Sequence, residues 1–214
     1  MKAERRPFPV VLAAPSGAGK TTLARALVER RTDVVFALSA TTRPPRTGEQ
    51  NEVDYRFVTD AEFAELRRSG ELLESARVHE HWYGTLRASV TRALDSGSSV
   101  VLDIDVQGAR RIRDLFPESV FIFVLPPSPQ IWRDRLTGRG TEGEAERRVR
   151  MGTALKELRA VTEFDYVVVN DDLGESLEAI EAIVDGERWR RNRWNGLDAR
   201  IGELERVLVQ YSGG

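Results

Sequence analysis

The sequence contains no cysteine, which excludes disulfide bonds and cysteine-based metal sites and predicts a protein of the reducing cytoplasm. Long apolar runs are missing as well, since no stretch approaches the roughly 20 apolar residues that a membrane span needs. Positive charge is not in surplus, because 32 Lys and Arg residues stand against 34 Asp and Glu residues. Nucleic-acid binders generally depend on such a surplus, so the composition argues against nucleic acid and against a membrane as partners.

Apolar residues make up 41% of the 214 positions, which is enough for one compact α/β domain with small insertions. Four continuous apolar runs are typical of buried strands, and helical patterns lie between them. The predicted strands cover residues 10–13, 100–104, 120–125 and 166–170, and the predicted helices cover residues 20–31, 86–96, 106–115 and 144–162. This alternation predicts a parallel sheet that is covered by helices on both faces.

A loop of small residues joins the first predicted strand to the first predicted helix. Its sequence is Ala14-Pro15-Ser16-Gly17-Ala18-Gly19-Lys20-Thr21, followed by Thr22. Strand, loop and helix in this order form a phosphate-binding P-loop, in which backbone N–H groups and the helix N-terminus surround phosphate oxygens. Lys20 would place its charge on the β- and γ-phosphates of a nucleoside triphosphate, and Thr21 would offer its hydroxyl to Mg²⁺. Ala14 replaces the first glycine of the pattern, which is harmless if its φ is negative.

Two segments depart from the alternation of strands and helices. Between residues 35 and 83 we expect short polar strands at 36–41, 55–58 and 72–78, around a helix that opens with a capping box from Thr59 to Glu62. A second segment, 126–150, contains an arginine-dense stretch with glycines beside it, which predicts a mobile cover. The core would then comprise residues 1–34, 84–125 and 151–214.

The C-terminal part predicts two amphipathic helices. Their apolar stripes consist of Leu173, Leu177, Ile180 and Val184, and of Leu197, Ile201, Leu204, Leu208 and Tyr211. Both stripes are expected to pack on the core, and a subunit contact is the alternative for the second stripe, which has the spacing of a short coiled coil. Between the stripes, four arginines surround Trp189 and Trp194, so a nucleic-acid patch is an alternative there to a solvated helix surface.

A second candidate for phosphate binding lies in the first departing segment. Arg43 and Arg46 are three residues apart and are braced by Pro44 and Pro45. Guanidinium forks match phosphate oxygens, and the prolines reduce the entropy that is lost on binding. Taken alone, the block has a solvated basic turn as its alternative. Together with the P-loop, it indicates a second phosphate-bearing ligand.

Several ordered motifs make the chain similar to guanylate kinases from Pro9 to about Glu187. These motifs are residues 15–23, Thr41-Thr42-Arg43-Pro44-Pro45-Arg46-Thr47-Gly48-Glu49, Asp54-Tyr55, Tyr83-Gly84-Thr85, Leu102-Asp103-Ile104-Asp105-Val106-Gln107-Gly108, Gly138-Arg139-Gly140-Thr141 and Val169-Asn170-Asp171-Asp172. The resemblance implies a P-loop core with a five-stranded parallel sheet flanked by helices, a small mixed α/β GMP-binding insertion at 35–83 and a short lid at 126–150. It also implies that ATP and GMP react to ADP and GDP with Mg²⁺, in purine nucleotide metabolism, with dGMP as a further acceptor.

The resemblance assigns roles to individual residues. Those implied in ATP binding are Ala14, Pro15, Ser16, Gly17, Ala18, Gly19, Lys20, Thr21, Thr22, Arg139, Asn170 and Asp171. Those implied in GMP binding are Ser39, Arg43, Arg46, Glu49, Tyr55, Glu74, Tyr83, Thr85 and Asp105. The candidates for stabilising the transferred phosphoryl charge are Lys20, Arg43, Arg139 and Arg150. Thr21 would bind Mg²⁺ directly, and Asp103 or Asp105 would order it through water.

Base preference is expected to depend on Glu74. A carboxylate can accept hydrogen bonds from guanine N1–H and N2–H₂, whereas adenine has an acceptor at N1 and no 2-amino group. Ser75 stands where the family often has tryptophan, which would leave the wall beside the base more open.

Two alternatives remain for the function. One is a catalytically silent guanylate-kinase-like interaction domain, although the retained Lys20 and Arg43 argue against it. The other is a nucleoside monophosphate kinase of different base preference. The expected state is a monomer or a homodimer, and the segment after about Arg188 exceeds the usual family length.

Overall fold

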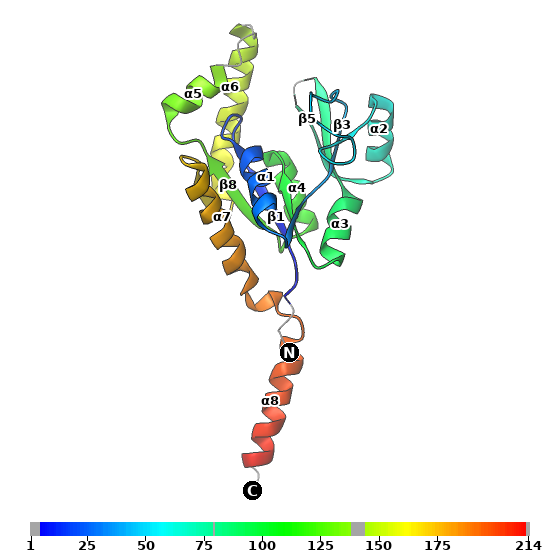
Figure 1. The fold of residues 1–214 in the computed structure, drawn as a ribbon, viewed down its shortest axis with the longest axis vertical. Helices are drawn as coiled ribbons and strands as arrows, with labels where there is room; N and C mark the ends of the chain where they lie inside the picture. Colours follow the sequence, from blue (N-terminus) through cyan, green and yellow to red (C-terminus); the bar gives the residue numbers. More distant parts are fainter. Residues whose placement is uncertain (1–4, 79, 138–143, 213–214) are drawn as a thin grey trace.

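The computed structural model describes residues 5–78, 80–137 and 144–212, and for residues 137 and 144–150 it describes the backbone only. The core is a five-stranded parallel sheet in the order β2-β7-β1-β8-β9 (Figure 1). Its strands are β1 (Pro9–Ala13), β2 (Val34–Phe36), β7 (Ser99–Asp103), β8 (Val120–Leu125) and β9 (Tyr166–Val169). The four strands predicted from apolar runs are all present, with ends displaced by no more than one residue.

Helices cover both faces of this sheet, because successive strand residues alternate between two apolar clusters. Val10 and Leu12 of β1 pack with α1 and α7 on one face, whereas Val11 packs with α3 and α4 on the other. The predicted doubly covered sheet is therefore confirmed. The helices are α1 (Lys20–Arg30), α2 (Asp60–Arg68), α3 (Arg87–Asp95), α4 (Val106–Leu115), α5 (Pro129–Thr137), α6 (Glu144–Arg159), α7 (Leu173–Arg188) and α8 (Leu197–Ser212), with short 3₁₀ turns η1 (Ala160–Glu163) and η2 (Arg191–Arg193).

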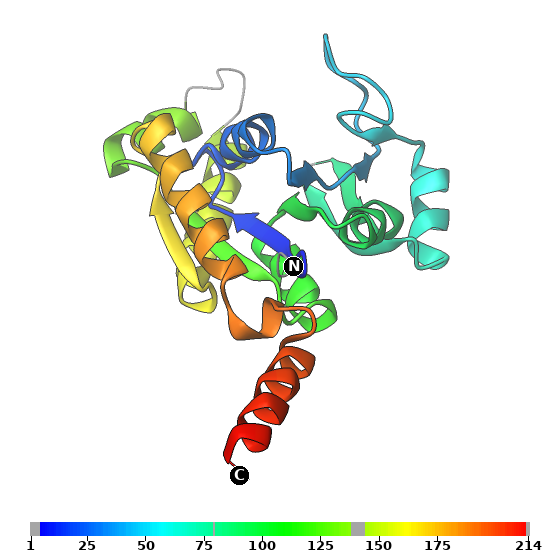
Figure 2. The same cartoon turned by 60° about the horizontal axis from the view of Figure 1, so that its bottom comes forward.

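A second, mixed sheet forms the insertion beside the core (Figure 2). Its order is β4-β3-β6-β5, from strands β3 (Ser39–Thr41), β4 (Arg56–Phe57), β5 (Leu72–Val78) and β6 (His81–Leu86). Helix α2 covers it through Phe63 and Leu66, which lie in a separate small apolar cluster. The predicted capping box is present, since Thr59 and Glu62 exchange side-chain and backbone hydrogen bonds at the start of α2.

The single strand predicted over residues 36–41 is wrong. Val34–Phe36 pairs with β7 in the core, whereas Ser39–Thr41 pairs with β4 and β6 in the insertion. Short runs of this kind do not reveal which sheet they join, because strand propensity depends on the partners in the folded sheet. Strand β6 likewise crosses the expected boundary at residue 83. We therefore propose that the insertion spans residues 37–86.

The predicted lid at 126–150 contains α5 and the first turns of α6. Residues 138–143 lie outside the described residues, so the mobile cover stays a prediction. Among the residues that are described, no helix combines the length and the apolar character that crossing a membrane requires.

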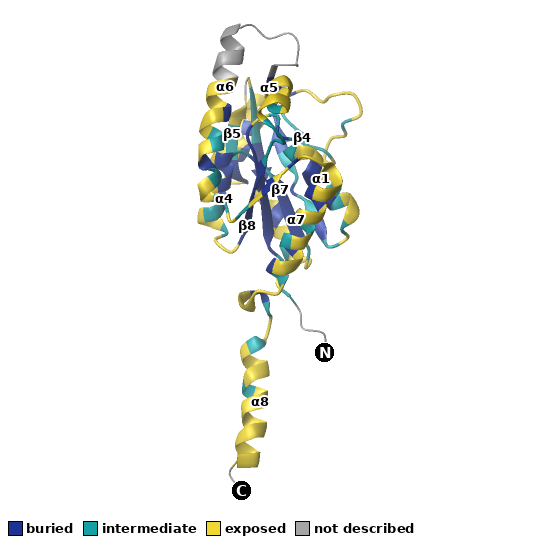
Figure 3. Ribbon diagram, turned by 90° about the vertical axis from the view of Figure 1, so that its left-hand side faces the viewer, coloured by how far each residue is buried: buried dark blue, intermediate teal, exposed yellow. Residues whose placement is uncertain are grey.

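The expectation that both C-terminal stripes pack on the core holds only for α7, and there not for Leu173, which is exposed. Leu177, Ile180 and Val184 are buried against α1 and the sheet, whereas no residue of α8 is buried. Gly196, with φ of +74°, turns the chain, and α8 projects away from the body (Figures 1 and 3). The packing prediction is therefore wrong for the last helix.

The arginines and tryptophans before α8 tie the two ends of the domain together. The Arg5 guanidinium lies over the rings of Trp189 and Trp194, 4.6 Å from each centroid. Arg193 is buried, pairs with the buried Glu187 at 3.6 Å and donates to the Glu118 backbone carbonyl. This cluster anchors the base of α8, and the nucleic-acid alternative for its exposed members stays a prediction.

The Arg193–Glu187 pair gives a prediction on stability. We expect Arg193→Ala to lower the free energy of unfolding by about 3–5 kcal/mol, because it removes the buried cation beside a buried carboxylate and leaves only the exposed Arg190 near it. Arg190→Ala is the matched control, since Arg190 contacts the same carboxylate from an exposed position and is worth about 0–1 kcal/mol. Denaturant unfolding measures both, and equal losses in the two variants would contradict a structural role for the buried pair.

Candidate active site

The P-loop connects the end of β1 to the start of α1. Gly17 and Gly19 have φ of +84° and +89°, which only glycine adopts without strain. A Cβ on Gly19 would also collide with the Asn170 side chain. Ala14 does not need such a conformation, since the one non-glycine residue with positive φ among those described is Glu52. The missing first glycine is therefore harmless, as the negative-φ expectation required.

Restoring that glycine gives a second prediction. We expect Ala14→Gly to lower the free energy of unfolding by about 0.4–1 kcal/mol, because glycine adds conformational freedom to the unfolded chain where alanine fits without strain. The turnover number should stay unchanged, since the loop geometry is the same. Thermal unfolding and a kinase assay measure the two effects, and a gain in activity would show that Ala14 distorts the loop.

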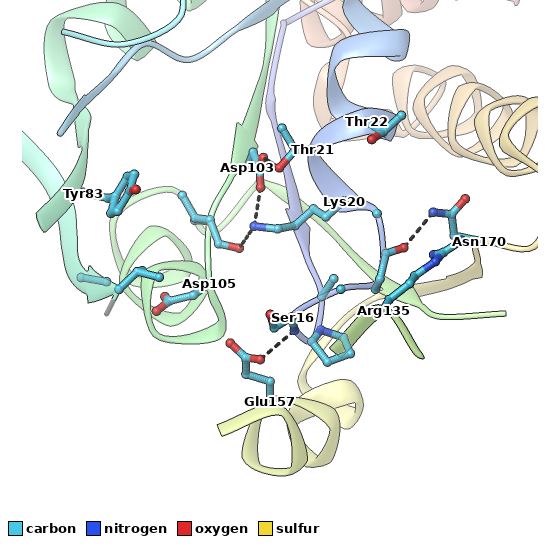
Figure 4. A pocket seen from close by; sticks show the side chains of 18 of the residues that line it. Ser16, Lys20, Thr21, Thr22, Tyr83, Asp103, Asp105, Arg135, Glu157 and Asn170 are labelled. Atoms are coloured by element: carbon cyan, nitrogen blue, oxygen red, sulfur yellow. Dashed lines mark hydrogen bonds and ion pairs between the residues drawn. The ribbon is translucent and has the colours of Figure 1, made fainter. Parts of the chain in front are cut away.

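Three side chains meet at the mouth of the loop. Lys20 donates to the Ile104 carbonyl at 2.7 Å and pairs with Asp103, and the Thr21 hydroxyl donates to Asp103 at 2.5 Å (Figure 4). Asp103 is the last residue of β7, which lies next to β1, so the carboxyl ends of adjacent parallel strands bring these groups together.

The structure distinguishes the positions of Asp103 and Asp105, between which the sequence could not divide the role of ordering Mg²⁺. Asp103 contacts both P-loop side chains, whereas Asp105 caps α4 by accepting a hydrogen bond from the Gly108 amide at 2.7 Å. Asp105 also lines the cleft farther from the loop, toward the insertion. Asp103 is thus the carboxylate beside the Thr21 hydroxyl.

Asn170 braces the P-loop from the end of β9. Its side-chain amide donates to the Ala18 carbonyl at 2.7 Å, and the residue is 8% exposed. Asp171 follows it and lines the same cleft. We propose that Asn170 acts on ATP binding through the shape of the loop.

Two contacts with Ser16 come from α5 and α6 and were not predicted. The Trp132 indole N–H donates to the Ser16 carbonyl at 2.8 Å, and the Ser16 amide donates to Glu157 at 3.1 Å. Burial raises the pKa of Glu157. These residues lie 116 and 141 positions along the chain from Ser16, so no local spacing signals them.

Arg135, from α5, also lines the cleft, beside Gly19. The sequence signals this residue only through its place within an arginine-rich segment.

The insertion sheet arranges three of the implied guanine-reading residues in one row. Ser39 of β3 pairs in register with Thr85 of β6, and Thr85 pairs with Glu74 of β5. A shift in register between Leu72 and Glu74 sets this row, since an unbroken ladder would place Leu73 opposite Thr85. The irregularity therefore buries Leu73 in the core and directs Glu74 into the cleft.

Glu74 is held firmly in that position. The amide and hydroxyl of Thr85 both donate to its Oε1, at 2.9 and 2.7 Å. A Cβ on Gly108 would lie 3.0 Å from Glu74 Oε2, so glycine permits the close approach of α4. Burial raises the pKa of Glu74, and the Thr85 hydrogen bonds oppose that shift.

Ser75, where the sequence predicted a more open wall, is not itself part of the cleft wall. Glu74, Ala76 and Val78 line the cleft, and Ser75 is absent from that lining because alternate residues of β5 face opposite sides. The more open wall at this position therefore stays a prediction.

Arg43 is buried and engaged within the chain, unlike the open guanidinium fork that the sequence suggested. Its Nη1 and Nη2 atoms donate to Glu49, both at 2.9 Å, and its Nε donates to the Tyr83 hydroxyl at 3.2 Å. A buried guanidinium needs such acceptors. The Arg43 hydrogen bonds in turn lower the pKa of Glu49. Tyr55 packs edge-on against Tyr83, and burial raises the pKa of Tyr55, so its hydroxyl stays protonated.

For the remaining predicted residues, the structure gives fewer contacts with the site. Arg46 is exposed, and its backbone amide donates to Glu49 at 2.7 Å. Arg139 lies outside the described residues, and of Arg150 the structure gives the backbone in α6 only. Thr22 lines the cleft at the start of α1.

One cleft of about 1020 Å³ joins these elements. The P-loop and Asp103 form one wall, and Ser39, Tyr55 and Glu74 belong to the other. A phosphate-binding loop that faces a second polar site on an inserted sheet defines a P-loop kinase with separate donor and acceptor sites.

Comparisons identify the family within this class. The sequence model of the guanylate kinase family matches residues 6–187. A guanylate kinase of Caldanaerobacter subterraneus subsp. tengcongensis is 42% identical over 203 residues, which cover 95% of this chain and 98% of the relative. A guanylate kinase of Thermotoga maritima is 46% identical over 203 residues, 95% of each chain. The crystal structure of guanylate kinase from Anaplasma phagocytophilum superimposes with a TM-score of 0.76 at 33% identity, covering 92% of this chain and 94% of that one. This chain belongs to the guanylate kinase family.

Proposed function

We propose that this enzyme transfers the γ-phosphoryl group of ATP to GMP, giving ADP and GDP, and that the cleft between the P-loop and the insertion holds both nucleotides. The observation that carries the proposal is the row Ser39–Thr85–Glu74. Ser39 and Glu74 line the same cleft as the P-loop, and the buried Thr85 holds Glu74 in place. A triphosphate on one wall and a base reader on the other is the arrangement that transfer between two nucleotides requires.

The donor side consists of Lys20, Thr21 and the loop amides. Lys20 exchanges its contacts with Asp103 and the Ile104 carbonyl for the β- and γ-phosphates, where its charge stabilises the transferred group. Arg135 adds a guanidinium at the same loop, and Arg139 and Arg150 are proposed to do so from the lid. A phosphate oxygen of GMP is already a nucleophile, so positioning and electrostatic stabilisation account for the chemistry without a general base.

Mg²⁺ fits the donor side. Thr21 and Asp103 present a hydroxyl and a carboxylate side by side, and hard oxygen donors of this kind suit Mg²⁺. Mg²⁺ usually keeps several waters and is bound through one or two protein oxygens together with substrate phosphates. Thr21 would bind it directly, Asp103 would hold its water, and the ion would neutralise charge between the phosphates.

The acceptor side reads guanine and holds the GMP phosphate. Glu74 lines the cleft and Thr85 occupies its Oε1, so Oε2 is proposed to accept from guanine. The phosphate is proposed to bind at Arg43, Arg46, Tyr55 and Tyr83, with Glu49 acting through Arg43 as a positioning residue.

An acceptor panel tests the proposal. ADP release is measured with ATP and GMP, dGMP, AMP, CMP or UMP, and we expect turnover with GMP and dGMP only. Absence of turnover with every acceptor would overturn the kinase proposal. Equal turnover with AMP and GMP would leave a nucleoside monophosphate kinase but would remove the role given to Glu74.

A further inference from the structure

Helix α8 carries an apolar stripe of which no residue is buried, and only Leu197, at its start, is partly covered. The stripe consists of Leu197, Ile201, Leu204, Leu208 and Tyr211, and exposure along it reaches 43% at Ile201, 51% at Leu204, 68% at Leu208 and 85% at Tyr211. Figure 3 shows the helix exposed along most of its length. A contiguous exposed stripe of this kind marks an interaction surface more often than an isolated exposed leucine does.

The anchoring of the helix keeps the stripe away from the body. The Arg6 amide donates to the Arg193 carbonyl and the Arg6 side chain donates to Asn195, both at 2.8 Å. The backbones of Arg5 and Trp194 form an isolated antiparallel β-bridge beside these contacts. The chain is thus fixed up to Asn195, and Gly196 alone separates this anchor from the first residue of α8.

We propose that the stripe is covered by α8 of a second copy of this chain, in a parallel two-stranded coiled coil. The spacing between stripe residues alternates between four and three, which places Ile201 and Leu208 at a positions and Leu197, Leu204 and Tyr211 at d positions. Ile201 at a with Leu204 at d is the combination that favours two parallel strands, whereas the next heptad has Leu208 at a and Tyr211 at d.

Charges beside the stripe select the parallel arrangement. Arg200 is at position g and Glu205 is at position e, so in a parallel pair Arg200 of one copy faces Glu205 of the other, twice by symmetry. An antiparallel pair would bring e positions together and would oppose Glu205 with Asp198 or with Glu205 of the second copy. In the single chain, Arg200 pairs with Glu203 of its own helix at 3.3 Å, an exposed contact that contributes little.

Single cysteines test both the contact and its direction, because the chain has no cysteine of its own. Tyr211→Cys places a thiol on the seam, and Gln210→Cys places one on the outer surface of the same turn. With oxidised glutathione as oxidant, we expect the first full-length variant to form a disulfide-linked dimer and the second to remain mostly monomeric. In an antiparallel pair centred on Leu204 the two 211 positions would lie about 21 Å apart, too far to bridge.

Charge exchange is the second test, measured by sedimentation velocity over a range of concentrations. We expect Arg200→Glu and Glu205→Arg each to shift the unmodified dimer toward monomer, and the double variant, or a mixture of the two single variants, to restore association. Turnover should stay unchanged in all of them, because α8 lies outside the cleft.

Three results would overturn the proposal. A monomer at every concentration would mean that the stripe is covered by the chain's own body or by another protein. A dimer whose association is unchanged by both Arg200→Glu and Glu205→Arg would show that the two copies do not meet through α8. Equal cross-linking at positions 210 and 211 would show chance collisions and not a seam.

Discussion

Replacing Lys20 with alanine is expected to lower kcat by at least about 10²–10³, the loss seen when one preorganised stabiliser of transition-state charge is removed. Lys20 is placed for this role by three features: the first turn of α1, the loop glycines, and the acceptors Asp103 and Ile104 carbonyl that hold its ammonium at the loop mouth. Because the phosphoryl charge grows in the transition state, the loss should appear chiefly in kcat, with a smaller change in KM for ATP.

The matched control is Lys156→Ala, which removes an exposed lysine from α6. Both variants should unfold at a similar temperature to the parent, since Asp103 keeps its hydrogen bond to Thr21 when Lys20 is absent. Steady-state kinetics and thermal unfolding are measured together. A loss of the folding transition in Lys20→Ala would make the lysine a structural residue, and an unchanged kcat would remove it from the mechanism.

Features that depend on neighbouring residues could be predicted from the sequence. The P-loop is local, because its strand, glycines, lysine and helix follow one another directly, and the structure places each as expected. The capping box of α2 is local in the same sense. Glu74 and Thr85 were implied by the resemblance, and the sheet does bring them together.

Features that depend on distant partners could not be predicted. The register shift that turns Glu74 toward the cleft arises from pairing between β5 and β6, and no composition signals it. The brace from Glu157 to Ser16 likewise spans most of the domain. The strand over 36–41 divides between two sheets because each half finds a different partner, and α8 stays exposed because its anchor directs it outward.

Glu74→Gln is expected to lower kcat/KM for GMP by about 10²–10⁴. Two hydrogen bonds from guanine to a charged acceptor are lost, each worth about 1.5–3 kcal/mol, and the new amide directs donors at the N1–H and N2–H₂ donors of the base. The matched control is Glu71→Gln, the same exchange three residues earlier at an exposed position. Turnover with GMP and AMP is measured in both, and a Glu74→Gln variant that keeps its full preference for GMP would contradict the assignment.

The same substitution should stabilise the protein at neutral pH, and the pH dependence distinguishes this effect from a packing change. Burial raises the pKa of Glu74, so in the native state its charge is costly, and the parent loses stability as pH rises from the ordinary glutamate value of 4.5 through the raised one. The gain in thermal stability of Glu74→Gln should therefore be largest above the raised pKa and should shrink as pH falls toward 4.5, where the parent carboxyl is neutral as well. In the parent, KM for GMP should rise over the same fall in pH, because a protonated carboxyl no longer accepts both guanine donors. A stability difference that is constant across this range would show that the charge of Glu74 carries no cost in the native state.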